Sequence, residues 1–232
     1  GEPTAGLPPL AFVSFLQTHD QVGNRAFGER LDALADPVRV EALLACLLLA
    51  PHVPMFFMGE EFAASSPFLY FCDFHAELAS AVTAGRRAEF AGFPAFADAD
   101  ARAHIPDPNA FETFAASKLR WEERSSKNGA NRLALVSQLL ALRRAHLEPH
   151  LAEASGGATL RCAGEAFVAT WQLGHGVRWT LRANFADEPA VFDAVAGEQV
   201  IYRGHPGDRS GPASALPPDG VEFTLLRAAD DR

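Results

Sequence analysis

The stretch FVSFLQTHDQVGNR, from Phe12 to Arg25, decides how the rest of the chain is interpreted. The apolar residues from Ala11 to Leu16 predict a short buried strand, and the polar loop after it presents His19 and Asp20 side by side. Barrels of parallel strands carry their chemistry on the loops that follow the strand ends. We therefore expect this loop to lie at the rim of a barrel active site.

A helix and a second strand follow. Asp36 and Pro37 are typical of a helix N-terminus, and this helix is predicted to end near Ala50, before Pro51. The apolar run from Val53 to Met58 predicts the second buried strand. A strand, a helix and a strand in this order form one βαβ unit, and continuous apolar strands favour a parallel sheet covered on both faces.

The remaining chain predicts helices and then an antiparallel sheet. Helices are expected in three segments, residues 77–90, 111–123 and 130–146. Two alternating segments, residues 167–173 and 177–185, flank a Gly-His-Gly turn and predict a β-hairpin, and further strands are expected at residues 198–202 and 221–226. We therefore expect an α/β barrel part with its following helices over residues 1–156 and a small antiparallel β-sandwich over residues 157–232.

The composition disfavours several classes of partner. The formal net charge of -9 argues against nucleic acid and against an anionic membrane surface. No apolar run reaches the length of a membrane span. Three widely spaced cysteines argue against a disulfide framework and favour the cytoplasm, and the histidines outside the first loop lack metal-ligand spacing. We therefore expect neither a metal nor another cofactor.

Four segments of the chain resemble one enzyme family, the α-amylase-type glycoside hydrolases. FVSFLQTHDQVGNR is similar to the family segment in which a strand leads into a His-Asp pair, and PMFFMGEEFAASSPFLYFCDF to the eighth barrel strand with its loop. IPDPNAFETFAASKLRW resembles a helical stretch beyond the barrel, and the β-domain occupies the place of the family's C-terminal domain. The resemblance implies that the chain holds the last two βα units of a (β/α)8 barrel.

The resemblance also implies an activity and the residues that serve it. The family cleaves α-glucans with retention, and HDQVGNRAFGERL resembles a member whose substrate is an α-glucan oligosaccharide ending in trehalose. Asp20 matches the carboxylate that stabilises the transition state, and His19 its neighbour in the innermost sugar subsite. Further substrate contacts are predicted at Gln21, Val22, Gly23, Asn24, Arg25, Glu60 and Asp73.

Some of these assignments have an alternative. Glu60 and Glu61 also suit a solvated or structural acidic pair, and Asp73 equally suits a loop cap. The aromatic residues between Phe68 and Phe74 fit either a carbohydrate cleft or packing, whereas the three tryptophans are assigned to packing.

The family's nucleophilic aspartate and acid glutamate precede the His-Asp pair by more residues than this chain has there. We therefore expect the isolated chain to be inactive and prone to association through an open barrel edge. Two alternatives remain: another α-amylase-type enzyme, such as a branching enzyme or a transferase, or a non-catalytic carbohydrate-binding module. A branching enzyme is expected to carry HDE where this chain has HDQ.

Overall fold

The structure, a computed structural model, describes residues 1–4, 6–204 and 215–227. The chain divides into two compact units. Unit 1 combines Gly1–Leu16, Ala35–Met55 and Ala134–Arg232, and unit 2 combines Gln17–Leu34 and Phe56–Leu133. The predicted domain boundary between residues 156 and 157 falls inside unit 1, in the loop before β3 (Thr159–Ala163). No helix among the described residues is long and apolar enough to cross a membrane.

Unit 1 contains the predicted parallel strand pair. Strands β1 (Val13–Ser14) and β2 (Val53–Pro54) pair in parallel, which confirms the expected order of strand, helix and strand. Helix α3 (Pro37–Leu49) precedes β2, and Asp36 caps its N-terminus by accepting a 2.8 Å hydrogen bond from the Val38 N–H. Both strands are shorter than the apolar runs that predicted them, because the parallel ladder extends over two residue pairs.

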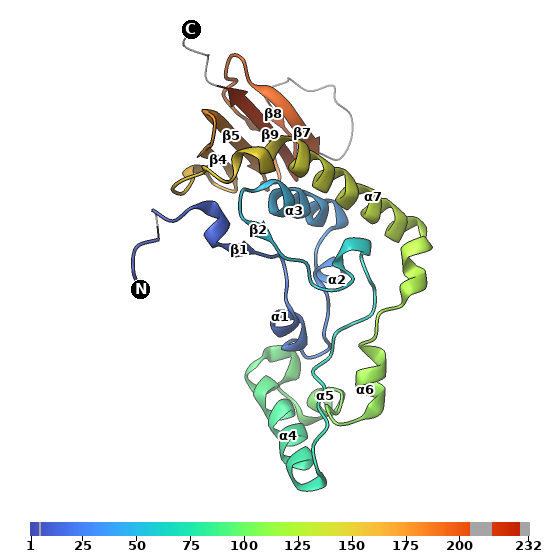
Figure 1. The fold of residues 1–232 in the computed structure, drawn as a ribbon. Helices are drawn as coiled ribbons and strands as arrows, with labels where there is room; N and C mark the ends of the chain where they lie inside the picture. The colour runs from blue at the N-terminus through green and yellow to red at the C-terminus, as the bar shows by residue number, and fades with distance from the viewer. Residues whose placement is uncertain (5, 205–214, 228–232) are drawn as a thin grey trace. The chain divides into compact units, whose positions relative to one another are not determined.

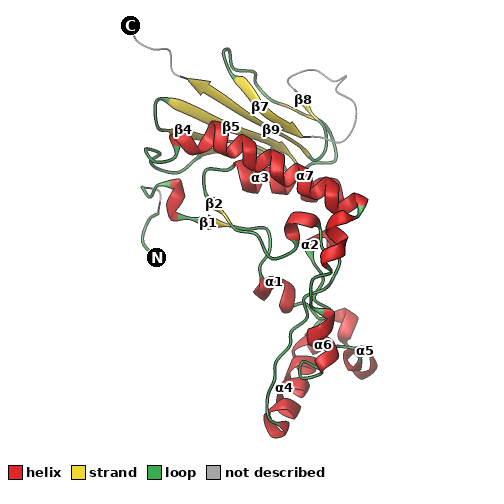
Figure 2. Ribbon diagram, turned by 45° about the vertical axis from the view of Figure 1, so that its right-hand side comes forward, coloured by secondary structure: helices red, strands yellow, loops and turns green. Residues whose placement is uncertain are grey.

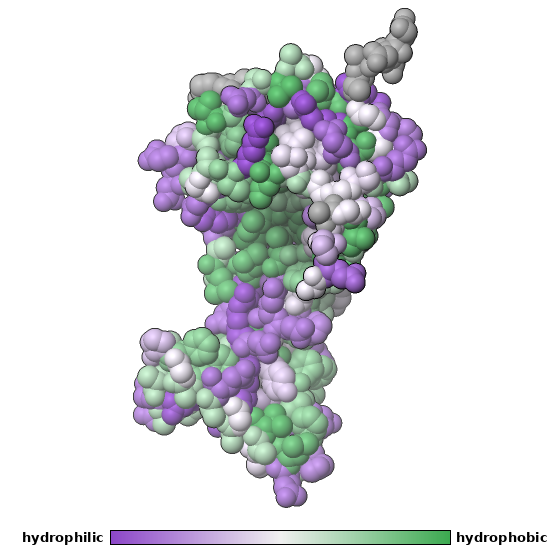
Figure 3. Space-filling view, turned by 90° about the vertical axis from the view of Figure 1, so that its left-hand side faces the viewer, coloured by the Kyte–Doolittle hydropathy of each residue, from purple (hydrophilic) through white to green (hydrophobic). Residues whose placement is uncertain are grey.

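The β1–β2 pair leaves one apolar face open to solvent, which we call the open strand face. It consists of four side chains on the same side of the two strands, Val13, Phe15, Val53 and Met55, which are between 39% and 57% exposed. The sequence favours strands covered on both faces, but these two have no third strand among the described residues. Figure 3 shows apolar residues gathering at the level of β1 and β2.

A five-stranded antiparallel sheet forms the other part of unit 1. Its strand order is β3-β4-β5-β9-β7, with β4 (Ala166–Leu173), β5 (Val177–Asn184), β7 (Gln199–Gly204) and β9 (Gly220–Arg227). Its apolar inner face faces α3 and the C-terminal part of α7 (Lys127–Leu142) (Figures 1 and 2). Trp179 is fully buried there, and its Nε1–H donates to the Leu49 carbonyl at 2.9 Å.

The sequence predicts this sheet well except at its margins. The β4–β5 hairpin is confirmed, and its turn residues His175 and Gly176 both have positive φ, as a tight two-residue turn requires. The segment that forms β3 carried no strand signal, because all five of its residues are exposed and its pattern lacks a buried face. A second layer is formed by the short pair β6 (Ala190–Val191) and β8 (Ala215–Leu216), which places Phe192 and Leu216 against Ala166.

A buried arginine joins the helices of unit 1. Helix α7 continues into a π-helical turn, Arg143–Leu147, whose first residue is 5% exposed. The Arg143 guanidinium donates to the carbonyl oxygens of Leu48, Ala50 and His52 at 2.7–2.9 Å. These carbonyls lie at the C-terminus of α3, where the helix leaves its last acceptors without partners.

Unit 2 is built from short helices joined by long loops. Its helices are α1 (His19–Gly23), α2 (Leu31–Leu34), α4 (Ala76–Glu89), α5 (Ala99–Ala103) and α6 (Phe111–Ala116). The prediction for residues 77–90 is confirmed by α4. The predicted helix over residues 111–123 is interrupted: α6 ends at Ala116, and a separate 3-10 helix covers Trp121–Ser125.

Candidate functional site

The His-Asp pair lies in the first turn of α1, at the surface of unit 2. Thr18 caps this helix in a reciprocal pair with Gln21: the Gln21 N–H donates to the Thr18 hydroxyl at 3.4 Å, and the Thr18 N–H donates to Gln21 Oε1 at 3.0 Å. His19 Nε2 and Asp20 Oδ1 are 3.2 Å apart, and the two side chains are 69% and 77% exposed. The Asp20 carboxylate has no other partner among the described residues, so it is free to accept hydrogen bonds from a ligand.

The remaining residues of this loop divide into exposed and supporting positions. Gln21 and Asn24 are exposed, whereas Val22 and Gly23 are buried. Arg25 is partly buried and donates from Nη1 to the Glu29 carbonyl at 2.5 Å. The predicted contacts with substrate therefore fit the exposed side chains directly, and the buried ones fit a supporting role.

A buried arginine on α4 holds the backbone of the loop. The Arg86 side chain is 5% exposed, and its Nη2 donates to the carbonyls of Gly23 at 2.8 Å and Arg25 at 2.9 Å. Its guanidinium also lies over the Phe90 ring at 4.7 Å and the Tyr70 ring at 5.2 Å. Sequence reasoning missed Arg86, because an arginine in a polar helix carries no sign that it will be buried.

The aromatic segment is tied to the same loop by a close backbone approach. Gly28 has φ +59°, and a Cβ atom there would lie 2.4 Å from the Phe68 carbonyl oxygen, so glycine is required. The Phe68 N–H donates back to the Gly28 carbonyl at 2.9 Å. This contact places the start of the aromatic segment beside the chain that follows the His-Asp pair.

Glu60 is placed in the interior of unit 2. Its side chain is 1% exposed, and Oε2 accepts a hydrogen bond from the Phe57 N–H at 3.0 Å. Burial raises the pKa of Glu60 to about 7; nearby Asp32 raises it further, whereas Arg132 opposes the shift. A buried side chain contacts no substrate directly, so a role of Glu60 in binding has to act through the position of its loop.

Two buried arginines surround the Glu60 loop. Arg30 donates from Nε to the Ser66 carbonyl at 2.6 Å and from Nη1 to the Met58 carbonyl at 2.8 Å. Arg132 forms a 2.8 Å ion pair with Asp32. These contacts explain why a segment rich in acidic and small residues keeps one conformation between Met58 and Ser66.

Asp73 and several aromatic side chains remain accessible. Asp73 is exposed and has no hydrogen bond among the described residues, so it is available to a ligand. Tyr70 and Phe74 are 42% and 43% exposed, whereas Phe71 packs on Phe114 at 5.2 Å between ring centroids. Trp121 was assigned to packing from sequence but is 55% exposed, although its ring contacts Phe62 at 5.9 Å. Residue type alone gave no signal for this exposure.

Comparisons with known proteins first define a class. The domain family described as a domain of unknown function (DUF3459) matches residues 154–222. A Salmonella typhimurium protein, whose crystal structure is described as that of a candidate α-amylase, superposes with a TM-score of 0.87 at 38% identity, over 98% of this chain and 37% of that chain. The isomaltulose synthase of Klebsiella sp. LX3 shares the fold alone, at 15% identity and a TM-score of 0.53 over 93% of this chain and 43% of that one. The chain resembles the C-terminal part of the α-amylase-type glycoside hydrolases.

Sequence relatives narrow the class. Malto-oligosyltrehalose trehalohydrolase of Mycobacterium tuberculosis is 40% identical over 230 residues, which cover 98% of this chain and 37% of the relative. The protein of the same name from Deinococcus radiodurans is 44% identical over 144 residues, which cover 62% of this chain and 23% of the relative. The chain thus spans little more than a third of these relatives and resembles their C-terminal region.

Proposed function

We propose that the chain supplies the C-terminal part of a malto-oligosyltrehalose trehalohydrolase, which releases trehalose by hydrolysing an α-1,4-glucosidic bond. The observation that carries this proposal is the exposed His19–Asp20 pair on a loop held rigidly by Thr18 and Arg86. The 40% identity to relatives of that name over nearly the whole chain supports the choice of activity.

In this proposal Asp20 acts on the sugar rather than on the scissile bond. Retaining glycosidases use two carboxyl groups, a nucleophile and an acid, and pass through a transition state with oxocarbenium character. A third carboxylate that accepts hydrogen bonds from ring hydroxyls stabilises that transition state as the ring flattens. Asp20 has the required free carboxylate, and His19 offers an imidazole N–H to the same sugar.

The two principal carboxyl groups are assigned to polypeptide equivalent to the rest of the relatives. The open strand face supports this part of the proposal, because apolar side chains on a two-stranded parallel pair need further strands to bury them. Val13, Phe15, Val53 and Met55 are the side chains on which neighbouring barrel strands would pack.

A hybrid enzyme tests the proposed function. The 232 residues replace the corresponding segment of the Deinococcus radiodurans relative, and trehalose release from maltooligosyl trehalose is measured. We expect activity in the hybrid and none in the relative that lacks this segment. A folded hybrid that fails to release trehalose contradicts the proposal, and a hybrid that transfers glucan chains instead favours the branching enzyme or transferase alternative.

A further inference from the structure

The outer face of the five-stranded sheet carries a polar groove, which we call the sheet groove. It is a cavity of about 350 Å³ over strands β3, β4 and β5. Thr159, Thr170 and Thr180 face one another in register across these three strands and line the groove. Because side chains alternate between the two faces of a sheet, this row lies opposite the apolar face that packs on α3.

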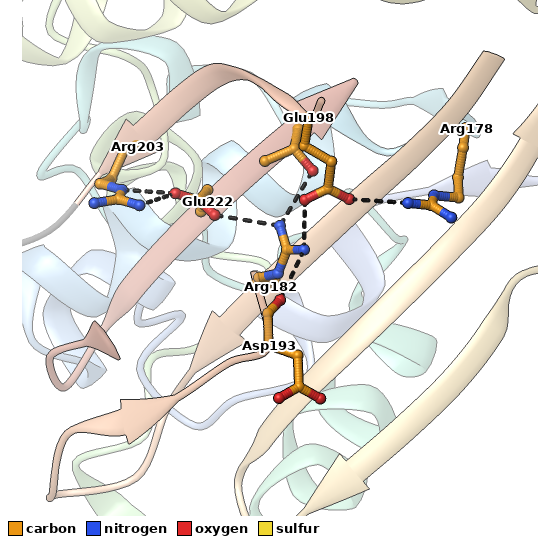
Figure 4. Close-up of polar contacts among 7 residues, drawn as sticks. Arg178, Arg182, Asp193, Glu198, Arg203 and Glu222 are labelled. Carbon is orange, nitrogen blue, oxygen red and sulfur yellow. Dashed lines mark hydrogen bonds and ion pairs between the residues drawn. The ribbon is translucent and has the colours of Figure 1, made fainter. Parts of the chain in front are cut away.

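Arginine side chains flank the threonine row and are fixed by ion pairs (Figure 4). Glu198 lies between two of them, with Oε2 2.6 Å from Arg182 Nη2 and Oε1 3.5 Å from Arg178 Nη2. Arg182 also pairs with Glu222 at 3.3 Å, and Glu222 pairs with Arg203. The Glu198 and Glu222 side chains are each 8% exposed, so the network is a rigid, mostly neutralised wall.

Several polar groups in the groove have no hydrogen-bond partner among the described residues. They include the hydroxyls of the three threonines, the amide of Gln172 and the guanidinium of Arg161. Gln172 and Arg161 are exposed at opposite sides of the threonine row, on β4 and β3. The groove therefore presents hydrogen-bond donors and acceptors together, in fixed positions and ready for a ligand.

This chemistry identifies the kind of ligand. Glu198 already neutralises Arg178 and Arg182, which disfavours a phosphate between them, and Val168 and Val195 are the apolar residues that line the groove, too few for an apolar ligand. Sugar hydroxyls both donate and accept hydrogen bonds, and the cavity volume is within the range of small-ligand sites. We propose that the sheet groove is a second carbohydrate-binding site, for a neutral oligosaccharide. The choice of an α-glucan as that oligosaccharide rests on the proposed function.

A second site on the same chain has a consequence for long substrates. A glucan bound in the groove is held at a high effective concentration near the chain, so its apparent affinity exceeds that of a short oligosaccharide. The benefit grows with glucan length and is absent for substrates too short to reach two sites.

Calorimetric titration of the 232-residue chain with maltoheptaose tests the proposal. We expect saturable binding that Arg161→Ala combined with Gln172→Ala weakens by about fivefold or more, since each lost hydrogen bond costs a few-fold in affinity. Both positions are exposed, and thermal unfolding checks that the double variant stays folded. The matched control, Asp20→Asn, leaves the groove intact and is expected to keep the binding.

Other outcomes overturn the proposal in distinguishable ways. Absence of binding, or equal binding by the double variant, removes the groove as a carbohydrate site. Loss of binding in Asp20→Asn alone places the sugar at the His-Asp loop, which contradicts the groove but favours the proposed function. Binding of inorganic phosphate with no binding of maltoheptaose shows that the groove is an anion site instead.

Discussion

The two main sheets of unit 1 differ in how completely the chain covers them. The five-stranded sheet has an apolar face buried against α3, with Trp179 and Phe223 fully buried, and a polar face open to solvent. The β1–β2 pair has two strands, and Val13 on it is 57% exposed. The contrast teaches that an apolar, exposed face marks a sheet that requires further polypeptide, whereas a polar, exposed face marks a completed one.

The largest expected effect comes from the completed sheet. Trp179→Ala removes a fully buried indole and its hydrogen bond to Leu49, and should lower the free energy of unfolding by about 3–5 kcal/mol. Urea unfolding followed by circular dichroism measures this. Trp121→Ala is the matched control, because that side chain is 55% exposed and should cost far less. Equal losses in the two variants would contradict the assignment of the core.

The second effect concerns the helix that connects the two sheets. Arg143→Met leaves the carbonyls of Leu48, Ala50 and His52 without their donor, and should cost about 2–4 kcal/mol in unfolding free energy. The adjacent exposed residue supplies the control, since Arg144→Met removes the same charge without a buried contact. If both variants unfold at the same urea concentration, the capping role of Arg143 is wrong.

A pH-dependent effect is expected at Glu60. Burial raises the pKa of Glu60 to about 7 in the folded chain, so the folded state binds a proton that the unfolded state releases near pH 4.5. Stability from this group is therefore present below about pH 4.5 and is lost as the pH rises toward 7. We expect Glu60→Gln to reduce the loss of unfolding free energy between pH 5 and pH 8 by about 1–3 kcal/mol.

Urea unfolding at both pH values measures this difference. Glu61→Gln is the control, because the neighbouring side chain is only partly buried. A pH profile that is the same in wild type and Glu60→Gln would show that Glu60 is not the group that titrates.

The smallest effect on stability, and the sharpest on association, is expected at the open strand face. Val13→Thr with Val53→Thr keeps the β-branched shape, so the unfolding free energy should change by less than about 1 kcal/mol. Sedimentation velocity should show less self-association, because the apolar contact area is reduced. Val191→Thr, on a 77% exposed residue outside this face, is expected to leave association unchanged. Unchanged association in the double variant would separate the face from any docking role.

Much of the fold is predictable from local sequence. The Asp36 cap, the α3 helix and the β4–β5 hairpin follow from residue type and periodicity, because each depends on neighbours close in the chain. Strand β3 was not predicted, because an edge strand with all residues exposed has no alternating signal. The break between α6 and Trp121 depends on tertiary contacts, including a 3.1 Å hydrogen bond from the Leu69 N–H to the Ser117 hydroxyl, which no local pattern encodes.

The candidate site shows the same division. The His19–Asp20 pair could be singled out from sequence, because the motif itself carries the chemistry. Whether the other predicted contacts face solvent could not, since the burial of Val22 and Glu60 depends on distant segments of the fold. The supporting role of Arg86 depends likewise on a contact between residues more than 60 positions apart.

The central claim, that Asp20 stabilises charge at a glucan-cleaving centre, is tested most directly by kcat/KM for trehalose release in the hybrid enzyme. Asp20→Asn keeps the size and shape of the side chain but removes its negative charge. We expect kcat/KM to fall by about 10²–10³, mainly through kcat, with Asp73→Asn as a milder comparison. An Asp20→Asn hybrid that releases trehalose at the wild-type rate would contradict this assignment.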